Sequence, residues 1–281
     1  MFSEMKRNGT ERGPLAGFWL AWAVCLPLYL LAASCSVKED RAHCPCHLLL
    51  DVSGVSAELF DSLDVSLDEN NGHILRFPLF PASAGEGPVA VDVRKGHPVL
   101  NVCAVENGAV WLTASDDVMR IPPGEQCPPL YLHSATLNTE VEEWTERIVL
   151  HKSFCTLHIL MEGNDPARPY PFSLQIRGDV DGYDAQGRPR TGDFAPFAFP
   201  TPDGRCTVRV PRQKDDTLEL LMCEEQTPLA TFALGEYLKA GGYDWTAPDL
   251  ADVSVRIDCA RLSLRIKIEK WSETYYFNVE I

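Results

Sequence analysis

The chain has 281 residues, of which 45% are hydrophobic and 23% charged, a composition that supports a packed core and excludes global disorder. Its formal net charge is −15 and it has no Lys/Arg-rich block. An acidic surface repels phosphate groups, so the sequence argues against a nucleic-acid partner. This length allows one large domain or two ordinary ones.

The first 34 residues have the pattern of an export signal. Three basic residues lie within positions 1–13, and an apolar stretch follows over Leu15–Ala33, interrupted at Pro27. Small residues then precede Cys35, as cleavage by a signal peptidase requires. We predict a lipoprotein signal peptide over residues 1–34 and acylation of the Cys35 thiol. Each buried CH₂ of a lipid chain contributes roughly 0.8 kcal/mol, so a multiply acylated cysteine holds the chain firmly on a membrane.

Residues 35–43 follow the predicted cleavage point and form a short polar tether. Two alternatives stay open for the preceding segment, an uncleaved membrane helix and an ordinary signal peptide. The nineteen residues of Leu15–Ala33 are just long enough to span a bilayer. Ala32 also stands where bacterial lipoproteins more often carry leucine.

The remainder of the chain has the pattern of an all-β protein, with short strands separated by turns. Period-two alternation or apolar runs predict strands at Leu63–Leu67, Val89–Val93, Val99–Val105, Ser173–Arg177, Arg205–Val210, Thr217–Cys223, Val253–Ile257 and Leu262–Ile268. Asp203-Gly204 predicts a hairpin turn. The Gly178–Gly192 stretch is interpreted as a loop, and Leu229–Ala240 as one short helix ended by the glycine at 241. Many short strands favour sandwiches or small barrels.

A weak internal repeat suggests two similar domains. The segments Cys46–Gly54 and Cys155–Gly163 both follow the pattern Cys-x-Leu-x-aliphatic-x-apolar-x-Gly, which places the cysteine and the apolar residues on one face of a strand. We therefore predict an N-terminal domain over residues 44–150 and a C-terminal domain over residues 151–281. Chance similarity is the alternative, because short alternating strands resemble one another.

Eight cysteines follow the predicted lipid site, and export makes disulfides possible. Eight cysteines allow 105 pairings. The repeat suggests one hypothesis, which pairs Cys46 with Cys103, Cys155 with Cys223, Cys44 with Cys127 and Cys206 with Cys259.

The sequence predicts no catalytic residue, no cofactor and no metal site. It has no nucleophile elbow, phosphate loop, dinucleotide fingerprint or His-Glu-x-x-His motif. The cluster His43–His47 has zinc-type ligands, but Cys-x-Cys is too tight a spacing and no second pair follows. Asp179, Asp181 and Asp184 do not match a calcium loop and are interpreted as a structural turn. A pair of acids brought together only by the fold stays open.

Several features in their order resemble the FimB-like minor fimbrial subunits, the anchor and accessory lipoproteins of type V fimbriae. These features are the Cys35 lipobox, the short acidic linker, the Cys-Pro before the first strand, Arg177-Gly-Asp-Val-Asp-Gly-Tyr-Asp184, Leu234-Gly-Glu-Tyr-Leu238 with Tyr243-Asp-Trp245, and Ile266-Lys-Ile-Glu-Lys-Trp271. The resemblance runs over essentially the whole mature chain. The chain departs from the family in its many cysteines and in Ala32.

The resemblance implies two transthyretin-like β-sandwich domains in tandem, held at the cell outer membrane by lipid on Cys35. It also implies that the partners are other fimbrial subunits, engaged by β-strand addition. A surface carbohydrate- or protein-binding lipoprotein is the alternative function, with Trp111, Trp144 or Trp245 as an aromatic platform. The aromatic residues at Tyr243–Trp245 and near the C-terminus are otherwise expected to pack in the core. A hydrolase with an unrecognised site is the third candidate.

Overall fold

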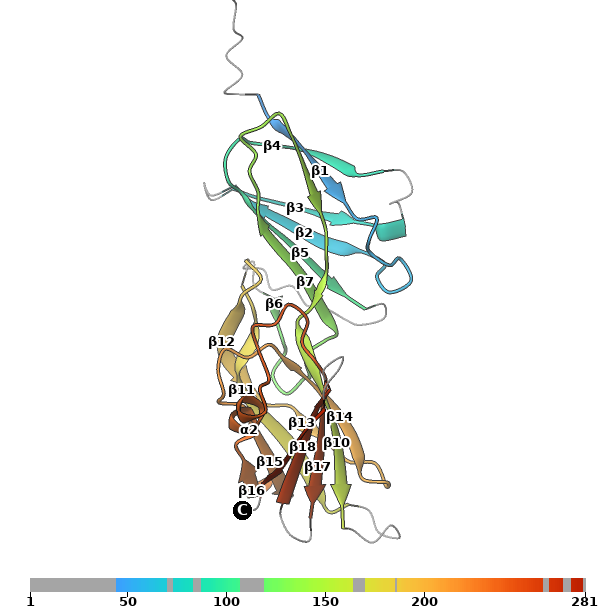
Figure 1. Cartoon of the computed structure of the whole chain (residues 1–281), viewed down its shortest axis with the longest axis vertical. Helices are drawn as coiled ribbons and strands as arrows, with labels where there is room; N and C mark the ends of the chain where they lie inside the picture. The colour runs from blue at the N-terminus through green and yellow to red at the C-terminus, as the bar shows by residue number, and fades with distance from the viewer. Residues whose placement is uncertain are drawn as a thin grey trace, which may run out of the picture. The chain divides into compact units, whose positions relative to one another are not determined.

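A computed structural model describes residues 44–69, 73–82, 87–106, 119–163, 170–184, 186–259, 263–269 and 274–279. These residues form β-strands and one short helix, α2 (Leu234–Ala240) (Figure 1). The strands are β1 (Cys46–Asp51), β2 (Leu63–Asp68), β3 (Ile74–Leu79), β4 (Val89–Val93), β5 (Val99–Val105), β6 (Met119–Arg120), β7 (Leu130–Thr136), β8 (Glu143–Arg147), β9 (His151–Lys152), β10 (Phe154–Glu162), β11 (Phe172–Tyr183), β12 (Pro189–Phe194), β13 (Phe197–Ala198), β14 (Arg205–Pro211), β15 (Glu219–Glu224), β16 (Thr227–Phe232), β17 (Val253–Asp258), β18 (Ser263–Glu269) and β19 (Thr274–Val279). No helix among the described residues has the length and apolar character needed to cross a membrane.

The first half of the described chain forms two sheets around one core, which we call the first sheet pair. One sheet has the order β4-β1-β8, and the other has the order β3-β2-β5-β7-β9. Alternation places Cys46, Leu48 and Leu50 of β1 inside, each 0–1% exposed. They meet Leu63 and Leu100 of the facing sheet in one cluster, so both sheets bury one face against the other.

The second half forms the second sheet pair. Its sheets have the orders β14-β10-β17-β18-β19 and β12-β11-β15-β16, with β13 and β6 pairing β11 outside that path. Cys155, Leu157 and Ile159 of β10 are at most 2% exposed and pack in one cluster with Leu174 and Leu220 of the facing sheet. Helix α2 adds buried Leu234 and Leu238 to this core.

The strands that carry the sequence repeat occupy the same place in the two sheet pairs. Strand β1 pairs antiparallel with β4 and parallel with β8, and β10 pairs antiparallel with β14 and parallel with β17. The facing sheets share an order as well, because β3-β2-β5-β7 corresponds to β12-β11-β15-β16. The four-residue face predicted for each repeat is buried in both strands. The repeat in the sequence therefore corresponds to a repeat in topology.

Two short segments cross from one sheet pair to the other. Strand β6 precedes residue 150 but pairs with β11, and Ile121 and Cys127 pack in the second core. Strand β9 follows residue 150 but pairs with β7 of the first sheet pair. The predicted domain boundary at residues 150/151 stays a prediction. A segment before the boundary packs in the second sheet pair, and a segment after it pairs in the first.

Each of the eight predicted strands corresponds to a strand of the structure, and two other predictions about secondary structure were wrong. The Gly178–Gly192 stretch is not a loop, because β11 runs to Tyr183 and β12 begins at Pro189. Buried Val180 and Tyr183 stabilise this hairpin, although its glycine and aspartate content is typical of loops. Gly182 permits the pairing with β6, since a Cβ there would lie 1.9 Å from the Met119 carbonyl oxygen.

The predicted helix Leu229–Ala240 is part strand and part helix. Its first residues belong to β16, which pairs with β15 and buries Phe232, whereas the helix begins at Leu234. Strand pairing across the sheet prevails here over local helical preference. The helix ends before Gly241, as predicted, and Gly204 lies in the predicted turn with a φ of +78°.

Candidate functional site

The predicted lipid site lies outside the described residues. Cys35, the signal peptide over 1–34 and the tether over 35–43 all precede Cys44, where the description begins. Acylation of Cys35 therefore stays a prediction.

All eight cysteines of the described chain are free thiols, so none of the four suggested disulfides is formed. The reason is strand alternation. Cys46 and Cys155 face the two cores, whereas Cys103 packs in a separate cluster and Cys223 follows core-facing Met222 on β15. In each of these two pairs, one cysteine faces the core and the other lies on the outer face of the opposite sheet, so the sheet separates them.

The other two suggested pairs are separated for different reasons. Cys206 lies on β14 and Cys259 follows β17, and these strands flank β10 on opposite sides. Cys44 is exposed, while Cys127 is fully buried in the second core.

The buried thiols are poor nucleophiles near neutral pH. Burial raises the pKa of Cys155 to about 12 and that of Cys206 to about 11. Burial also raises the pKa of Cys103 and Cys127. Since the thiolate is the reactive form, none of these four positions suits nucleophilic catalysis.

The zinc-type cluster of the sequence is divided by β1. Cys46 points into the core, and His47 points to the opposite face, where its Nδ1 lies 2.6 Å from Asp92 Oδ1. Among the described residues, no group of three or more His, Cys, Asp or Glu side chains is placed to hold a metal ion.

The acidic segment after Gly178 binds its own hairpin. Arg190 Nη1 donates to both Asp181 carboxylate oxygens at 2.7 Å. Asp184 accepts from the backbone N–H groups of Gln186 and Arg188 at 2.9 Å. Gly187 completes the turn with a φ of +71°, a conformation that favours glycine. Asp184 thus lies in a turn, as the sequence favoured, whereas Asp179 and Asp181 lie on β11.

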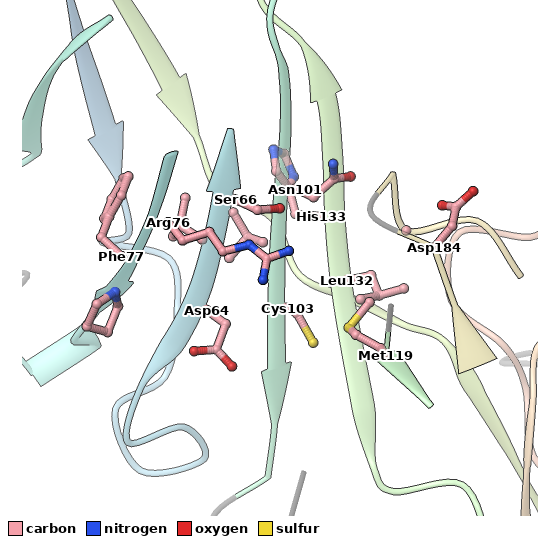
Figure 2. Close-up of a pocket in the computed structure, with 14 residues that line it drawn as sticks. Asp64, Ser66, Arg76, Phe77, Asn101, Cys103, Met119, Leu132, His133 and Asp184 are labelled. Carbon is pink, nitrogen blue, oxygen red and sulfur yellow. The ribbon is translucent and has the colours of Figure 1, made fainter. Parts of the chain in front are cut away.

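A cavity of about 360 Å³ lies on the outer face of the β3-β2-β5-β7 sheet (Figure 2). Strand register aligns two rows of side chains across this face. The first row is Arg76–Ser66–Asn101–Ser134, and the second row is Pro78–Asp64–Cys103–Leu132. Met119 of β6 and the turn residues Asp184 and Gly187 line the same cavity, so both sheet pairs contribute to it.

The cavity gathers polar groups of both charges. Figure 2 shows Arg76 extending from β3 across β2, with Asp64 and Ser66 beside it. Asn101 is 8% exposed. A guanidinium, a carboxylate, a hydroxyl and an amide around an apolar floor suit a small polar ligand that both donates and accepts hydrogen bonds.

Sequence reasoning missed this cavity. Alternation in Leu63–Leu67 already assigns Asp64 and Ser66 to the face opposite the core, which is the only local signal. The rows depend on the register of four strands and on a turn more than fifty residues further along the chain, and none of these is visible in one sequence.

Among the described residues, no strand covers either edge of the β4-β1-β8 sheet. Within the described residues, β4 and β8 pair only with β1. In the second sheet pair, by contrast, β18 and β19 extend the corresponding sheet beyond β17. The opposite edge of that sheet is β14, which is bonded to a loop: Cys127 N–H donates to the Arg209 carbonyl at 3.1 Å.

The two suggested platform tryptophans that the structure describes, Trp144 and Trp245, pack against different cores and form no exposed row. Trp144 packs against the first core and its Nε1 donates to Glu146 Oε2 at 3.2 Å. Trp245 packs against the second core, edge-on to buried Tyr243 at 4.7 Å between ring centroids. Core packing of Tyr243–Trp245 is thereby confirmed, and Trp111 lies outside the described residues.

No protein-family model and no curated protein matches this chain. Its fold is similar to solved structures from Bacteroidales. A candidate polysaccharide-binding protein from Bacteroides thetaiotaomicron VPI-5482 gives a TM-score of 0.59 at 12% identity, covering 84% of this chain and 98% of that one. A candidate adhesin from Bacteroides ovatus gives 0.54 at 11%, covering 86% and 97%.

The fimbrial anchor protein Mfa2 from Porphyromonas gingivalis is also similar. Its TM-score is 0.53 at 11% identity, and the match covers 83% of this chain and 100% of that chain. At such identities the likeness is one of fold.

Proposed function

We propose that this chain is a fimbrial anchor or accessory lipoprotein of the outer membrane, which engages other fimbrial subunits by β-strand addition. The observation that carries the proposal is the uncovered β4-β1-β8 sheet in a fold that spans the full length of a fimbrial anchor protein. An open edge offers unpaired backbone donors and acceptors in a row, so an added strand gains main-chain hydrogen bonds.

The proposal includes two transthyretin-like sandwiches in tandem, over residues 44–150 and 151–281. The matching strand orders of the two sheet pairs support it. Lipid on Cys35 would place the tandem at the membrane through the 35–43 tether. The role is structural and adhesive, without catalysis, and the raised thiol pKa values are consistent with that role.

Replacement of the lipid-bearing cysteine tests the anchor. Cys35→Ala should release the protein from the outer-membrane fraction, and mass spectrometry of the wild type should find an acylated N-terminal cysteine. Cys44→Ala is the matched control, because Cys44 is the nearest following cysteine and is exposed. Unchanged membrane attachment of the Cys35→Ala protein would contradict the anchor.

The partner is tested in the membrane. Fimbrial subunits should co-purify with the full-length protein from a detergent extract of native membranes. Deletion of the protein should leave fimbriae detached or altered in length. Intact fimbriae of normal length and attachment in the deletion strain would contradict the proposal.

The cavity supports a second candidate function, a surface lipoprotein that binds carbohydrate or another polar ligand. Its volume of about 360 Å³ and its facing Asp64 and Arg76 favour this reading. A glycan array with the purified full chain tests it, with Arg76→Ala as the cavity variant. Arg94→Ala is the control, since Arg94 is an exposed arginine elsewhere on the same sheet pair. Equal glycan signals from the two variants would exclude the cavity as the binding site.

A further inference from the structure

The second sheet pair contains its own example of an added strand. Strand β18 pairs antiparallel with β17, and the residues opposite Val253, Val255 and Ile257 are Ile268, Ile266 and Leu264. Strand β17 is parallel to β10, as β8 is parallel to β1. The outer edge of β8 is therefore the place in the first sheet pair that β18 occupies in the second.

Within the part of the chain that the structure describes, alternate residues of β8 direct backbone groups to no other strand. His47 N–H donates to the Glu142 carbonyl at 2.8 Å, and Ile148 N–H donates to the Asp51 carbonyl at 2.9 Å. Along a strand, the backbone N–H and C=O groups of successive residues point to opposite sides, so the even-numbered residues of β8 form the hydrogen bonds to β1. Glu143, Thr145 and Arg147 consequently direct their N–H and C=O groups away from β1.

Side chains around this edge indicate what fits it. Val141 and Val149 flank β8 and are 40% and 47% exposed, two of the few large apolar side chains that the described surface leaves so open. Residues 140–147 also carry four glutamates against one arginine. An occupant with apolar residues alternating with basic ones would cover the valines and offset the negative charge.

We propose that the β8 edge accepts an antiparallel strand from a neighbouring fimbrial subunit, with apolar residues at every second position and Lys or Arg between them. This inference rests on the proposed function and names the edge and the partner chemistry. The segment Leu262–Lys270 of this chain has that composition, with three basic residues against one acidic residue. It provides a probe that does not require the natural partner.

Peptide binding to the full-length protein in detergent tests the edge. A fluorescent Leu262–Lys270 peptide should bind, and a peptide of the same composition with its apolar residues grouped together should bind at least tenfold more weakly. Thr145→Pro removes an outward N–H and should weaken binding at least tenfold. Rising salt should also weaken binding.

The opposite edge of the same sheet offers a matched control. Residues 46, 48 and 50 of β1 direct their backbone toward β4, so Ala90 of β4 directs its N–H outward. Ala90→Pro should leave binding within twofold of wild type. Equal losses in Ala90→Pro and Thr145→Pro would overturn the proposal, as would crosslinks that place the bound peptide at β17 instead of β8.

A charge variant guards against a folding defect in Thr145→Pro. Glu143→Lys keeps the backbone donor at an exposed position and should weaken binding of the basic peptide several-fold at low salt. Co-purification of fimbrial subunits is measured in parallel. If subunits co-purify equally with wild type and Thr145→Pro, the β8 assignment fails while the anchor function stands. If none co-purifies with wild type, the proposed function fails.

Discussion

The two sheet pairs share one strand order but differ in how their sheets end. The three-stranded β4-β1-β8 sheet stops at β8, where Trp144 and Glu146 are only partly buried. The corresponding Val253 and Val255 of β17 are 0% exposed, and their sheet continues into β18. One architecture thus gives a closed, apolar sheet in the second sheet pair and an open, acidic edge in the first.

The polar residues of β8 form a small network behind this open edge. Glu146 Oε1 lies 3.4 Å from His133 Nε2, and Trp144 donates to the same carboxylate. A carboxylate is costly to bury unless it is paired, so these partners stabilise Glu146 where the second sheet pair has valine. The network joins β8 to β7 of the facing sheet, because His133 lies on β7.

The largest effect is expected from core leucines at matching positions. Leu48→Ala and Leu157→Ala should each cost about 2–5 kcal/mol of unfolding free energy, measured by urea titration. Leu157→Ala should cost more, because its strand neighbours Val208 and Val253 are 0% exposed, whereas the Leu48 neighbour Trp144 lies at an edge that can relax. A larger loss in Leu48→Ala would contradict the contrast between a closed and an open sheet.

Alkaline pH should reveal the next difference. Unfolded Cys155 loses its proton near its ordinary pKa of 9.0, but the buried thiol keeps it until about 12. The folded state binds more protons in this window, so this stability is complete below pH 9 and falls by about 1.4 kcal/mol per pH unit above it. Cys155→Ala should flatten the fall between pH 9 and 11 in urea titrations.

The matching cysteine of the first sheet pair is the control. Burial also raises the pKa of Cys46, but nearby Lys95 opposes the shift. Cys46→Ala should therefore change the alkaline slope less than Cys155→Ala does. An equal change in both variants would mean that the two cores bury their thiols alike.

How far the sequence predicts this molecule depends on whether a strand is covered on one face or on both. Alternation identified the buried faces of Cys46–Leu50 and Cys155–Ile159, because one side of each strand meets the core and the other does not. Strands β5 and β15 are buried on both faces, so their apolar runs give no sign of which way Cys103 or Cys223 points. The disulfide hypothesis was wrong for that reason.

The open edge and the cavity were beyond the sequence for a related reason. Nothing local to Glu143–Arg147 tells whether another strand follows beside it, because β18 lies over a hundred residues from β8. The turn at Asp184–Gly187 reaches the Asn101 row only through the tertiary fold.

A smaller effect is expected where the two sheet pairs meet. Tyr183 is fully buried; its hydroxyl donates to the Ser153 carbonyl at 2.5 Å and accepts from Arg212 N–H at 3.0 Å. Tyr183→Phe leaves both backbone groups without this partner and should cost about 1–3 kcal/mol in thermal or urea unfolding. Tyr243→Phe is the control, since its hydroxyl donates to Ala251 O at 2.7 Å and otherwise contacts the Cys155 thiol, both within the second half. A loss in Tyr243→Phe that exceeds that in Tyr183→Phe would contradict this ranking.

The smallest effect concerns two carboxylates at the matching strands β1 and β10. Asp92 lies 2.6 Å from His47, but both side chains are more than 60% exposed, so Asp92→Asn should cost less than about 1 kcal/mol. Asp252 is less exposed, and its carboxylate accepts hydrogen bonds from Lys152 Nζ at 2.6 Å and from Thr156 N–H at 2.7 Å. His47 and Thr156 occupy equivalent positions of the repeat, although Asp92 lies on β4 and Asp252 precedes β17. Asp252→Asn should cost more, about 1–3 kcal/mol. Urea titrations of the two variants at neutral pH measure the difference. Equal losses would indicate that solvent screens the two carboxylates alike.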